Sequence, residues 1–138
     1  MTAEGGCLCG AVRYRLEGPP LRADYCHCRT CQRAAGAPVV AWGTWPADRF
    51  AWSRGEPEVF ASSARGERWF CPGCGTPLAF VDRGDPTLVD VTLASLDEPA
   101  AFPPECHAWT TSRVPWLELA DGLPRHDGGR PKDESGGP

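Results

Sequence analysis

The sequence predicts a single, mainly β domain with one short helix, and three observations support this fold class. Apolar and polar residues alternate in several short runs, as they do in half-buried strands. Glycine (16 residues) and proline (15 residues) are frequent and scattered, which interrupts any long helix. Eight cysteines fall mostly in close clusters, and bound metal would hold such short strands together.

The N-terminal part of the chain contains four expected elements. Residues 11–17 (AVRYRLE) alternate and predict a strand, and residues 21–28 (LRADYCHC) predict a second strand that enters a cysteine cluster. Residues 28–35 contain helix-forming side chains and precede Gly36, which predicts one short helix that ends there. Residues 38–45 (PVVAWGTW) are rich in valine and tryptophan and predict a buried strand.

Short strands are expected to continue through the second half. Residues 47–55, 58–63 and 67–70 are three strand-like runs separated by turn residues. Residues 77–96 predict a hairpin whose turn is the run DRGDP. Residues 107–119 fit either a strand that contains a turn or a helical turn.

The C-terminal residues 121–138 differ from the rest in composition. They are dense in glycine and proline, mix both charges and have no large apolar side chain after Leu123. Such a segment buries too little surface to offset the entropy lost on ordering. We therefore expect a folded domain over residues 3–120 and a disordered tail over residues 121–138.

Composition and charge exclude some classes of protein. The chain has 138 residues, of which 41% are hydrophobic, and this suits one compact domain. The net charge of -4 argues against a general nucleic-acid binder. No apolar run approaches the roughly 20 residues of a membrane span, and the start lacks the features of a secretory signal. These features predict a cytoplasmic protein with reduced cysteines, whereas a secreted protein could form four disulfides. They give no prediction of oligomeric state.

The run CPGCG is the strongest local signal of metal binding. Zn–S bonds of about 2.3 Å in a tetrahedron place sulfurs roughly 3.8 Å apart, and a Cys-x-x-Cys turn provides that separation. The run CLC near the N-terminus can supply two further ligands. Cys7, Cys9, Cys71 and Cys74 would then form a closed structural site. The alternative is a set of redox dithiols, although a redox Cys-x-x-Cys motif usually begins a helix and a β-like run follows here.

The run CHCRTC contributes Cys26, Cys28 and Cys31, one ligand short of a tetrahedral zinc site. Two arrangements remain open. Either Cys106 or His107 completes a closed site, or water or substrate takes the fourth position. An open position is characteristic of catalytic zinc, because only there can the metal activate a bound group.

Four motifs in order resemble the family of glutathione-dependent formaldehyde-activating enzymes, which includes centromere protein V. In this chain they are CLCGAVRY, CHCRTCQRAAGAP, RWFCPGCGTPLAF and CHAWTTSRVPW. The resemblance runs from about Gly5 to Leu119. It implies a β-tent fold and two zinc ions per chain. The four cysteines of the closed site would hold the structural zinc, and the three of CHCRTC the catalytic zinc.

The activity that gives this family its name joins formaldehyde and glutathione to form S-hydroxymethylglutathione. It is classed as a carbon–sulfur lyase because the reverse reaction cleaves that bond. Many members have no assigned substrate, so the resemblance implies a small thiol and an aldehyde more firmly than their identities. The alternatives are a glutathione carrier without turnover and a zinc scaffold for a protein partner.

Several side chains near the cysteine motifs are candidates for substrate contact. Arg29, Arg33 and Arg113 could bind the carboxylates of a glutathione-like thiol, or could be solvated surface charges. His27 lies between two cysteines and could transfer protons near neutral pH or pack as an ordinary side chain. The remaining candidates neighbour the cysteines or fall in the last motif: Gln32, His107 and Trp109.

Overall fold

The structure is a computed structural model that describes residues 1–130. These residues form a mainly β fold with one α-helix, α1 (Arg29–Ala35), which confirms the predicted fold class. The strands are β1 (Thr2–Gly6), β2 (Arg13–Glu17), β3 (Arg22–Cys26), β4 (Val40–Pro46), β5 (Phe50–Arg54), β6 (Glu58–Ala61), β7 (Gly66–Phe70), β8 (Pro77–Asp82), β9 (Leu88–Thr92) and β10 (His107–Ala108). Four short 3₁₀ helices are η1 (Ala47–Arg49), η2 (Leu93–Ser95), η3 (Pro99–Ala101) and η4 (Thr110–Ser112).

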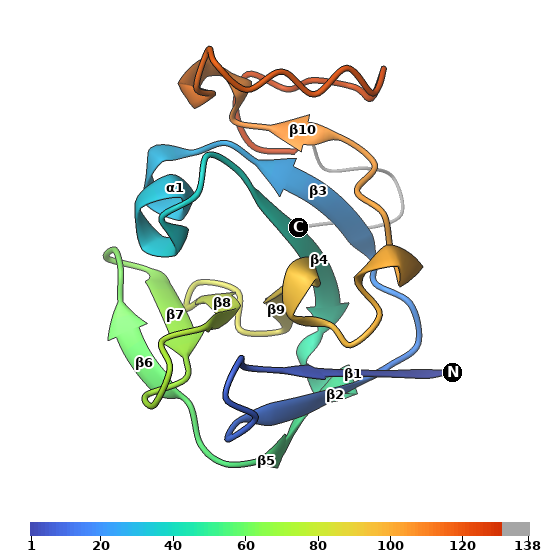
Figure 1. Cartoon of the computed structure of the whole chain (residues 1–138), viewed down its shortest axis with the longest axis vertical. Coiled ribbons are helices and arrows are strands. Elements are labelled where there is room, and N and C mark those ends of the chain that lie inside the picture. The colour runs from blue at the N-terminus through green and yellow to red at the C-terminus, as the bar shows by residue number, and fades with distance from the viewer. Residues whose placement is uncertain (131–138) are drawn as a thin grey trace.

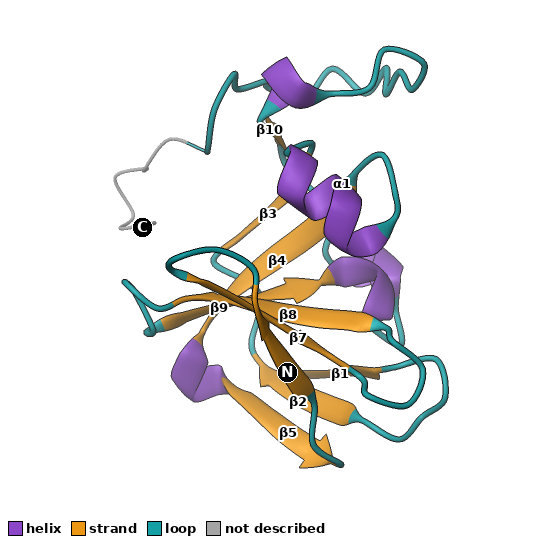
Figure 2. Cartoon of the chain, turned by 90° about the vertical axis from the view of Figure 1, so that its left-hand side faces the viewer, coloured by secondary structure: helices purple, strands orange, loops and turns teal. Residues whose placement is uncertain are grey.

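The strands form two sheets, shown in Figure 1 and, from the side, in Figure 2. The smaller sheet has the order β1-β2-β5, and the larger has the order β10-β3-β4-β9-β8-β7-β6. Neighbouring strands are antiparallel except for β10, which pairs parallel with β3. The predicted hairpin of residues 77–96 is present as β8 and β9.

The main core lies between the two sheets. Tyr14 and Leu16 alternate with exposed or half-buried arginines on β2, so one face of this strand points inward. Trp45 of β4 is fully buried against them, and its indole N–H donates to the Gly18 carbonyl at 3.0 Å. Burial of each such apolar side chain contributes roughly 1.5–3 kcal/mol.

Strand β1 was not predicted, because its sequence TAEGG has low strand propensity. Its glycines are needed where the strand approaches its neighbours closely. A Cβ atom on Gly5 would lie 2.6 Å from the Ser95 carbonyl oxygen and would also collide with the Tyr14 ring. Close packing therefore overrides propensity at this edge of the smaller sheet.

The helix α1 follows its sequence signals closely. Cys28 is the N-cap, and its sulfur accepts a hydrogen bond from the backbone N–H of Cys31. Gly36 ends the helix in the left-handed conformation, with φ of 61°. None of the described helices is long and apolar enough to cross a membrane.

Disorder was expected from Asp121 onward, and the structure describes residues 121–130 of this segment with backbone hydrogen bonds to other parts of the chain. This segment runs beside β10: the N–H of His107 donates to the Pro124 carbonyl, and that of His126 donates to the His107 carbonyl. Further along, the N–H of Trp109 donates to the Gly128 carbonyl at 2.8 Å. Backbone hydrogen bonds thus order a segment that has few apolar side chains to bury. Residues 131–138 of the predicted tail lie outside the described residues.

Candidate metal centres and the adjoining cavities

The structure brings together the four cysteines predicted to form a closed site. Their sulfurs all lie within 4.8 Å of one another. The Cys7–Cys9 separation is 3.6 Å and the Cys9–Cys71 separation is 3.7 Å, close to the roughly 3.8 Å expected for sulfurs around a tetrahedral zinc. All eight cysteines of the chain are free thiols, so the disulfide alternative does not apply.

Backbone N–H groups around this four-sulfur site favour thiolates. The N–H of Val12 donates to the Cys7 sulfur at 3.3 Å, and the N–H of Gly73 donates to the Cys71 sulfur at 3.3 Å. Gly75 has φ of 79°, a conformation that glycine adopts without strain, and its N–H bonds the Cys71 carbonyl. The spacing and the donors fit a structural metal ion.

A second cluster contains Cys26, Cys28 and Cys31, whose sulfurs also lie within 4.8 Å of one another. Cys26 ends β3, Cys28 caps α1 and Cys31 lies in the first turn of that helix. The strand-to-helix connection therefore assembles all three ligands locally. A guanidinium N–H of Arg68, on the facing strand β7, lies 3.5 Å from the Cys31 sulfur.

The thiols of this three-sulfur site strongly perturb one another. Hydrogen bonds from Cys26 and Cys31 lower the pKa of Cys28 to about 2, while hydrogen bonding to Cys28 raises the pKa of Cys26. Removal of one proton is therefore easy, but removal of all three would place three negative charges together. A divalent cation relieves that repulsion, so this donor set fits a soft metal such as zinc.

Neither of the two residues considered as a fourth ligand joins this cluster. Within residues 1–130, the Cys106 sulfur does not belong to the group, and burial raises the pKa of its thiol. The His107 ring is fully buried, and both of its nitrogens have other partners. Its Nδ1 lies 2.8 Å from Nε2 of His27, and its Nε2 lies 2.8 Å from a carboxylate oxygen of Asp121.

His27 therefore belongs to a hydrogen-bonded series, His27–His107–Asp121, that runs from two buried histidine rings to a carboxylate at the surface. Its side chain is 3% exposed, and burial together with the neighbouring His107 lowers its pKa. It lines a separate cavity of about 250 Å³ that also contains Arg113. These hydrogen bonds anchor the loop between Cys26 and Cys28 to the C-terminal segment that contains Asp121.

A cavity of about 480 Å³ lies over the three-sulfur site, and we call it the thiol cavity. Its wall includes the three cysteines together with Trp109, which the sequence predicts, and Arg68, which it does not. Trp109 has φ of 58°, the single non-glycine residue in the described chain with positive φ. Such a conformation is unfavourable for a bulky residue and is often found at functional sites.

The remaining predicted side chains do not line the thiol cavity. Arg29 and Arg33 line an adjoining cavity of about 610 Å³, the arginine cavity, which shares Arg68 with the thiol cavity. Gln32 is buried, and its amide nitrogen donates to the carbonyls of His27 and Ser112. Gln32 thus holds the cysteine loop against η4.

Arg68 is the main site residue that sequence reasoning missed. It packs over the Phe80 ring, with the guanidinium carbon 5.2 Å from the ring centroid. Its Nε is buried and has no hydrogen-bond partner in the described part of the chain. The only signal in the sequence is its position on the strand that leads into CPGCG, which does not reveal a contact with Cys31.

Comparison with known proteins identifies the family. The family model described as "Glutathione-dependent formaldehyde-activating enzyme" matches residues 2–112. A Halomonas elongata protein named for the same family is 31% identical over 128 residues, covering 86% of this chain and 82% of the relative. An uncharacterized lyase of Schizosaccharomyces pombe is 35% identical over 79 residues, covering 56% of each chain.

A crystal structure of a Rhodobacter sphaeroides protein has a similar fold. The TM-score is 0.58 at 21% identity, and the alignment covers 89% of this chain and 98% of that one. The cysteine clusters thus lie in a fold found in a solved structure. Together with the match over residues 2–112, these findings show that the chain belongs to the glutathione-dependent formaldehyde-activating enzyme family.

Proposed function

We propose that this protein is a zinc-dependent enzyme of the carbon–sulfur lyase type. It forms or cleaves an S-hydroxymethyl adduct between a small, glutathione-like thiol and formaldehyde or a related aldehyde. The observation that carries the proposal is the three-sulfur site: three convergent cysteines, no fourth side-chain ligand within residues 1–130, and a cavity above them. The names of the relatives support the same class of reaction.

The two sites have different roles in this proposal. The four-sulfur site holds a structural zinc that ties Cys9 to Cys71, 62 positions apart in the chain. Cys26, Cys28 and Cys31 hold the second zinc. Zinc bound there supplies an open coordination position that lowers the pKa of a substrate thiol, since zinc prefers sulfur ligands.

In this reaction the side chains of the protein hold the substrates in place and balance charge. The substrate thiolate attacks the aldehyde carbon, the C–S bond forms, and the electron pair of the carbonyl bond moves to oxygen. The proton lost by the thiol is taken up by that oxygen, which gives the hydroxymethyl product. Arg68 reaches the Cys31 sulfur from the cavity wall, and its positive charge offsets the excess negative charge of three thiolates. Trp109 contributes an aromatic surface to the wall of this cavity.

The substrate carboxylates are the proposed partners of the arginine cavity. Arg29 and Arg33 lie on α1, before and after Cys31 in the sequence, and Arg68 of β7 lines the same cavity. A guanidinium binds a carboxylate through two parallel hydrogen bonds, so this cavity suits the terminal carboxylate of a peptide-like thiol. Gln32 and His107 have structural partners instead, and we assign them to positioning the cysteine loop.

The proposal is tested by NMR exchange spectroscopy on formaldehyde and glutathione, with and without the zinc-loaded protein. We expect the protein to accelerate exchange between free glutathione and its hydroxymethyl adduct. Cys28→Ser should abolish the acceleration, and Cys106→Ala is the matched control that should retain it. Binding of glutathione without any acceleration would indicate a carrier, and absence of both would reject the proposed function.

A further inference from the structure

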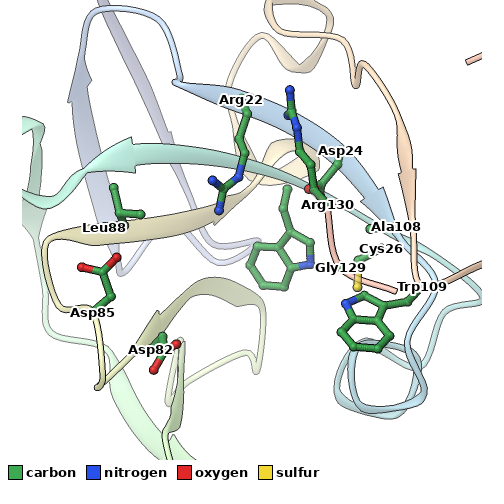
Figure 3. A pocket seen from close by; sticks show the side chains of 11 residues that line it. Arg22, Asp24, Cys26, Asp82, Asp85, Leu88, Ala108, Trp109, Gly129 and Arg130 are labelled. Atoms are coloured by element: carbon green, nitrogen blue, oxygen red, sulfur yellow. The ribbon is translucent and has the colours of Figure 1, made fainter. Parts of the chain in front are cut away.

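Cys26 and His27 are neighbours in the chain, but their side chains line different cavities. The Cys26 sulfur lies at one end of the cavity in Figure 3, beside the ring of Trp109, and Cys26 also lines the thiol cavity. His27 lines the cavity of about 250 Å³, which we call the histidine cavity. Among residues 1–130, none that lines it also lines the thiol cavity, the arginine cavity or the cavity of Figure 3. The histidine cavity is therefore separate from the space that the proposed reaction uses.

Two arginines give the histidine cavity positive charge. Arg113 follows η4, and Arg125 lies on the C-terminal segment, where its guanidinium donates to the carbonyl of Leu119. A guanidinium nitrogen of Arg125 lies 4.0 Å from a carboxylate oxygen of Asp121, whereas Arg113 forms no ion pair within residues 1–130. The one acidic residue in the described lining is Glu118, which is exposed and pairs with neither arginine. The balance of charge therefore favours an anion in this cavity.

The hydrogen bonds of His107 decide which nitrogen of His27 carries hydrogen. A carboxylate only accepts hydrogen bonds, so the His107 Nε2 that lies 2.8 Å from Asp121 donates to it. The other oxygen of Asp121 accepts from the backbone N–H of Leu123 at 3.0 Å, which fixes the carboxylate in place. The Nδ1 of a neutral His107 ring then has no hydrogen, so it accepts from Nε2 of His27 at 2.8 Å. The carboxylate thus sets the tautomer of both rings.

This series of hydrogen bonds leaves Nδ1 of His27 as a hydrogen-bond acceptor. A neutral imidazole carries one hydrogen, and in His27 that hydrogen is donated to His107. A hydrogen on the second nitrogen would add a positive charge to a buried ring that already has Arg113 and Arg125 as charged neighbours. Among residues 1–130, Nδ1 of His27 forms no hydrogen bond, so its lone pair remains for a ligand in the cavity that His27 lines.

We propose that the histidine cavity binds a small oxyanion that retains a hydroxyl hydrogen, represented by hydrogen phosphate. Arg113 and Arg125 donate to its charged oxygens, and its O–H group donates to Nδ1 of His27. Sulfate has a similar shape but no hydrogen at neutral pH, so one of its oxygens would bring a lone pair against the lone pair of His27. The cavity therefore distinguishes phosphate from sulfate. The inference does not rest on the proposed function, which assigns no ligand to this cavity.

The first test compares phosphate with sulfate on the zinc-loaded, full-length protein. The chain has three histidines, so NMR spectra that correlate imidazole nitrogens with ring hydrogens report on each nitrogen separately. We expect hydrogen on Nε2 of His27 and His107, and a shift of the Nδ1 signal of His27 when phosphate is added. Sulfate should bind about tenfold more weakly or less, through the loss of one charged hydrogen bond. This comparison needs no substitution, so it does not depend on the folding of a variant.

Two variants then locate the bound anion. Arg113→Gln should weaken phosphate binding by about tenfold or more, since it removes one of the two guanidiniums of the histidine cavity. Arg33→Gln removes the same charge from the arginine cavity and is the control, which should leave the phosphate-induced shift of His27 unchanged. Absence of phosphate binding, equal affinity for phosphate and sulfate, a stationary Nδ1 signal of His27, or unchanged affinity in Arg113→Gln would each overturn the inference. The proposed function would stand in all of these cases.

Discussion

Replacement of Arg68 by methionine isolates the electrostatic support of the three-sulfur site. Methionine keeps an unbranched apolar stem over the Phe80 ring but removes the guanidinium that reaches the Cys31 sulfur. We expect zinc to bind this site more weakly in Arg68→Met. The cause is that three thiolates with one divalent cation keep one excess negative charge, which Arg68 offsets.

The size of the effect follows from the contact. At 3.5 Å, two unit charges interact by about 5 kcal/mol at an effective dielectric constant of about 20, which is an upper limit. Arg68 is partly exposed, so solvent screens the interaction. A charge-assisted hydrogen bond contributes about 1.5–3 kcal/mol net, which corresponds to a roughly ten- to hundredfold change in zinc affinity. Partners that contact metal ligands have effects of about this size.

Competition with a chromophoric chelator measures zinc release from both sites of one chain. The zinc dissociation constant of the three-sulfur site should rise in Arg68→Met, while that of the four-sulfur site stays unchanged and serves as an internal reference. Arg54→Met, an exposed arginine on β5, should alter neither constant. An unchanged constant for the three-sulfur site in Arg68→Met would refute the electrostatic reasoning.

Three further predictions concern stability. Asp121→Asn removes the carboxylate that holds His107 and should lower the urea midpoint of unfolding, whereas Asp127→Asn, in the same segment, should not. Leu16→Ala leaves a cavity at a fully buried position and should lower the free energy of unfolding, measured in urea, by about 2–5 kcal/mol. Leu8 is 89% exposed, so Leu8→Ala should lower it by less than about 0.5 kcal/mol. A metal at the four-sulfur site would act as a cross-link over 62 positions of the chain. Removal of zinc from this site by a chelator should therefore lower the free energy of unfolding by about 4 kcal/mol, and an unchanged thermal midpoint would contradict this.

Local chemistry explains which parts of the fold the sequence could predict. The short helix was predictable because its end signal, Gly36, lies beside it in the chain. The hairpin of residues 77–96 was predictable because a turn separates two β-rich runs. The cysteine groupings followed from ligand number and spacing, and the structure brings the same residues together.

Contacts between distant segments explain what the sequence could not predict. Strand β1 depends on Gly5 packing against the Tyr14 ring, which composition does not reveal. Residues 121–130 are ordered by backbone hydrogen bonds to β10, although their side chains suggest disorder. Arg68 and Cys31 are 37 positions apart, so their contact arises only when β7 faces α1.

The most direct test of the account is the coordination of zinc at the three-sulfur site, measured by a crystal structure of the zinc-loaded protein before and after addition of glutathione. We predict that Cys26, Cys28 and Cys31 are the only protein ligands and that the thiol of glutathione occupies the fourth position. A fourth protein atom on the zinc, from Cys106 or any other residue, with glutathione excluded, would contradict the account.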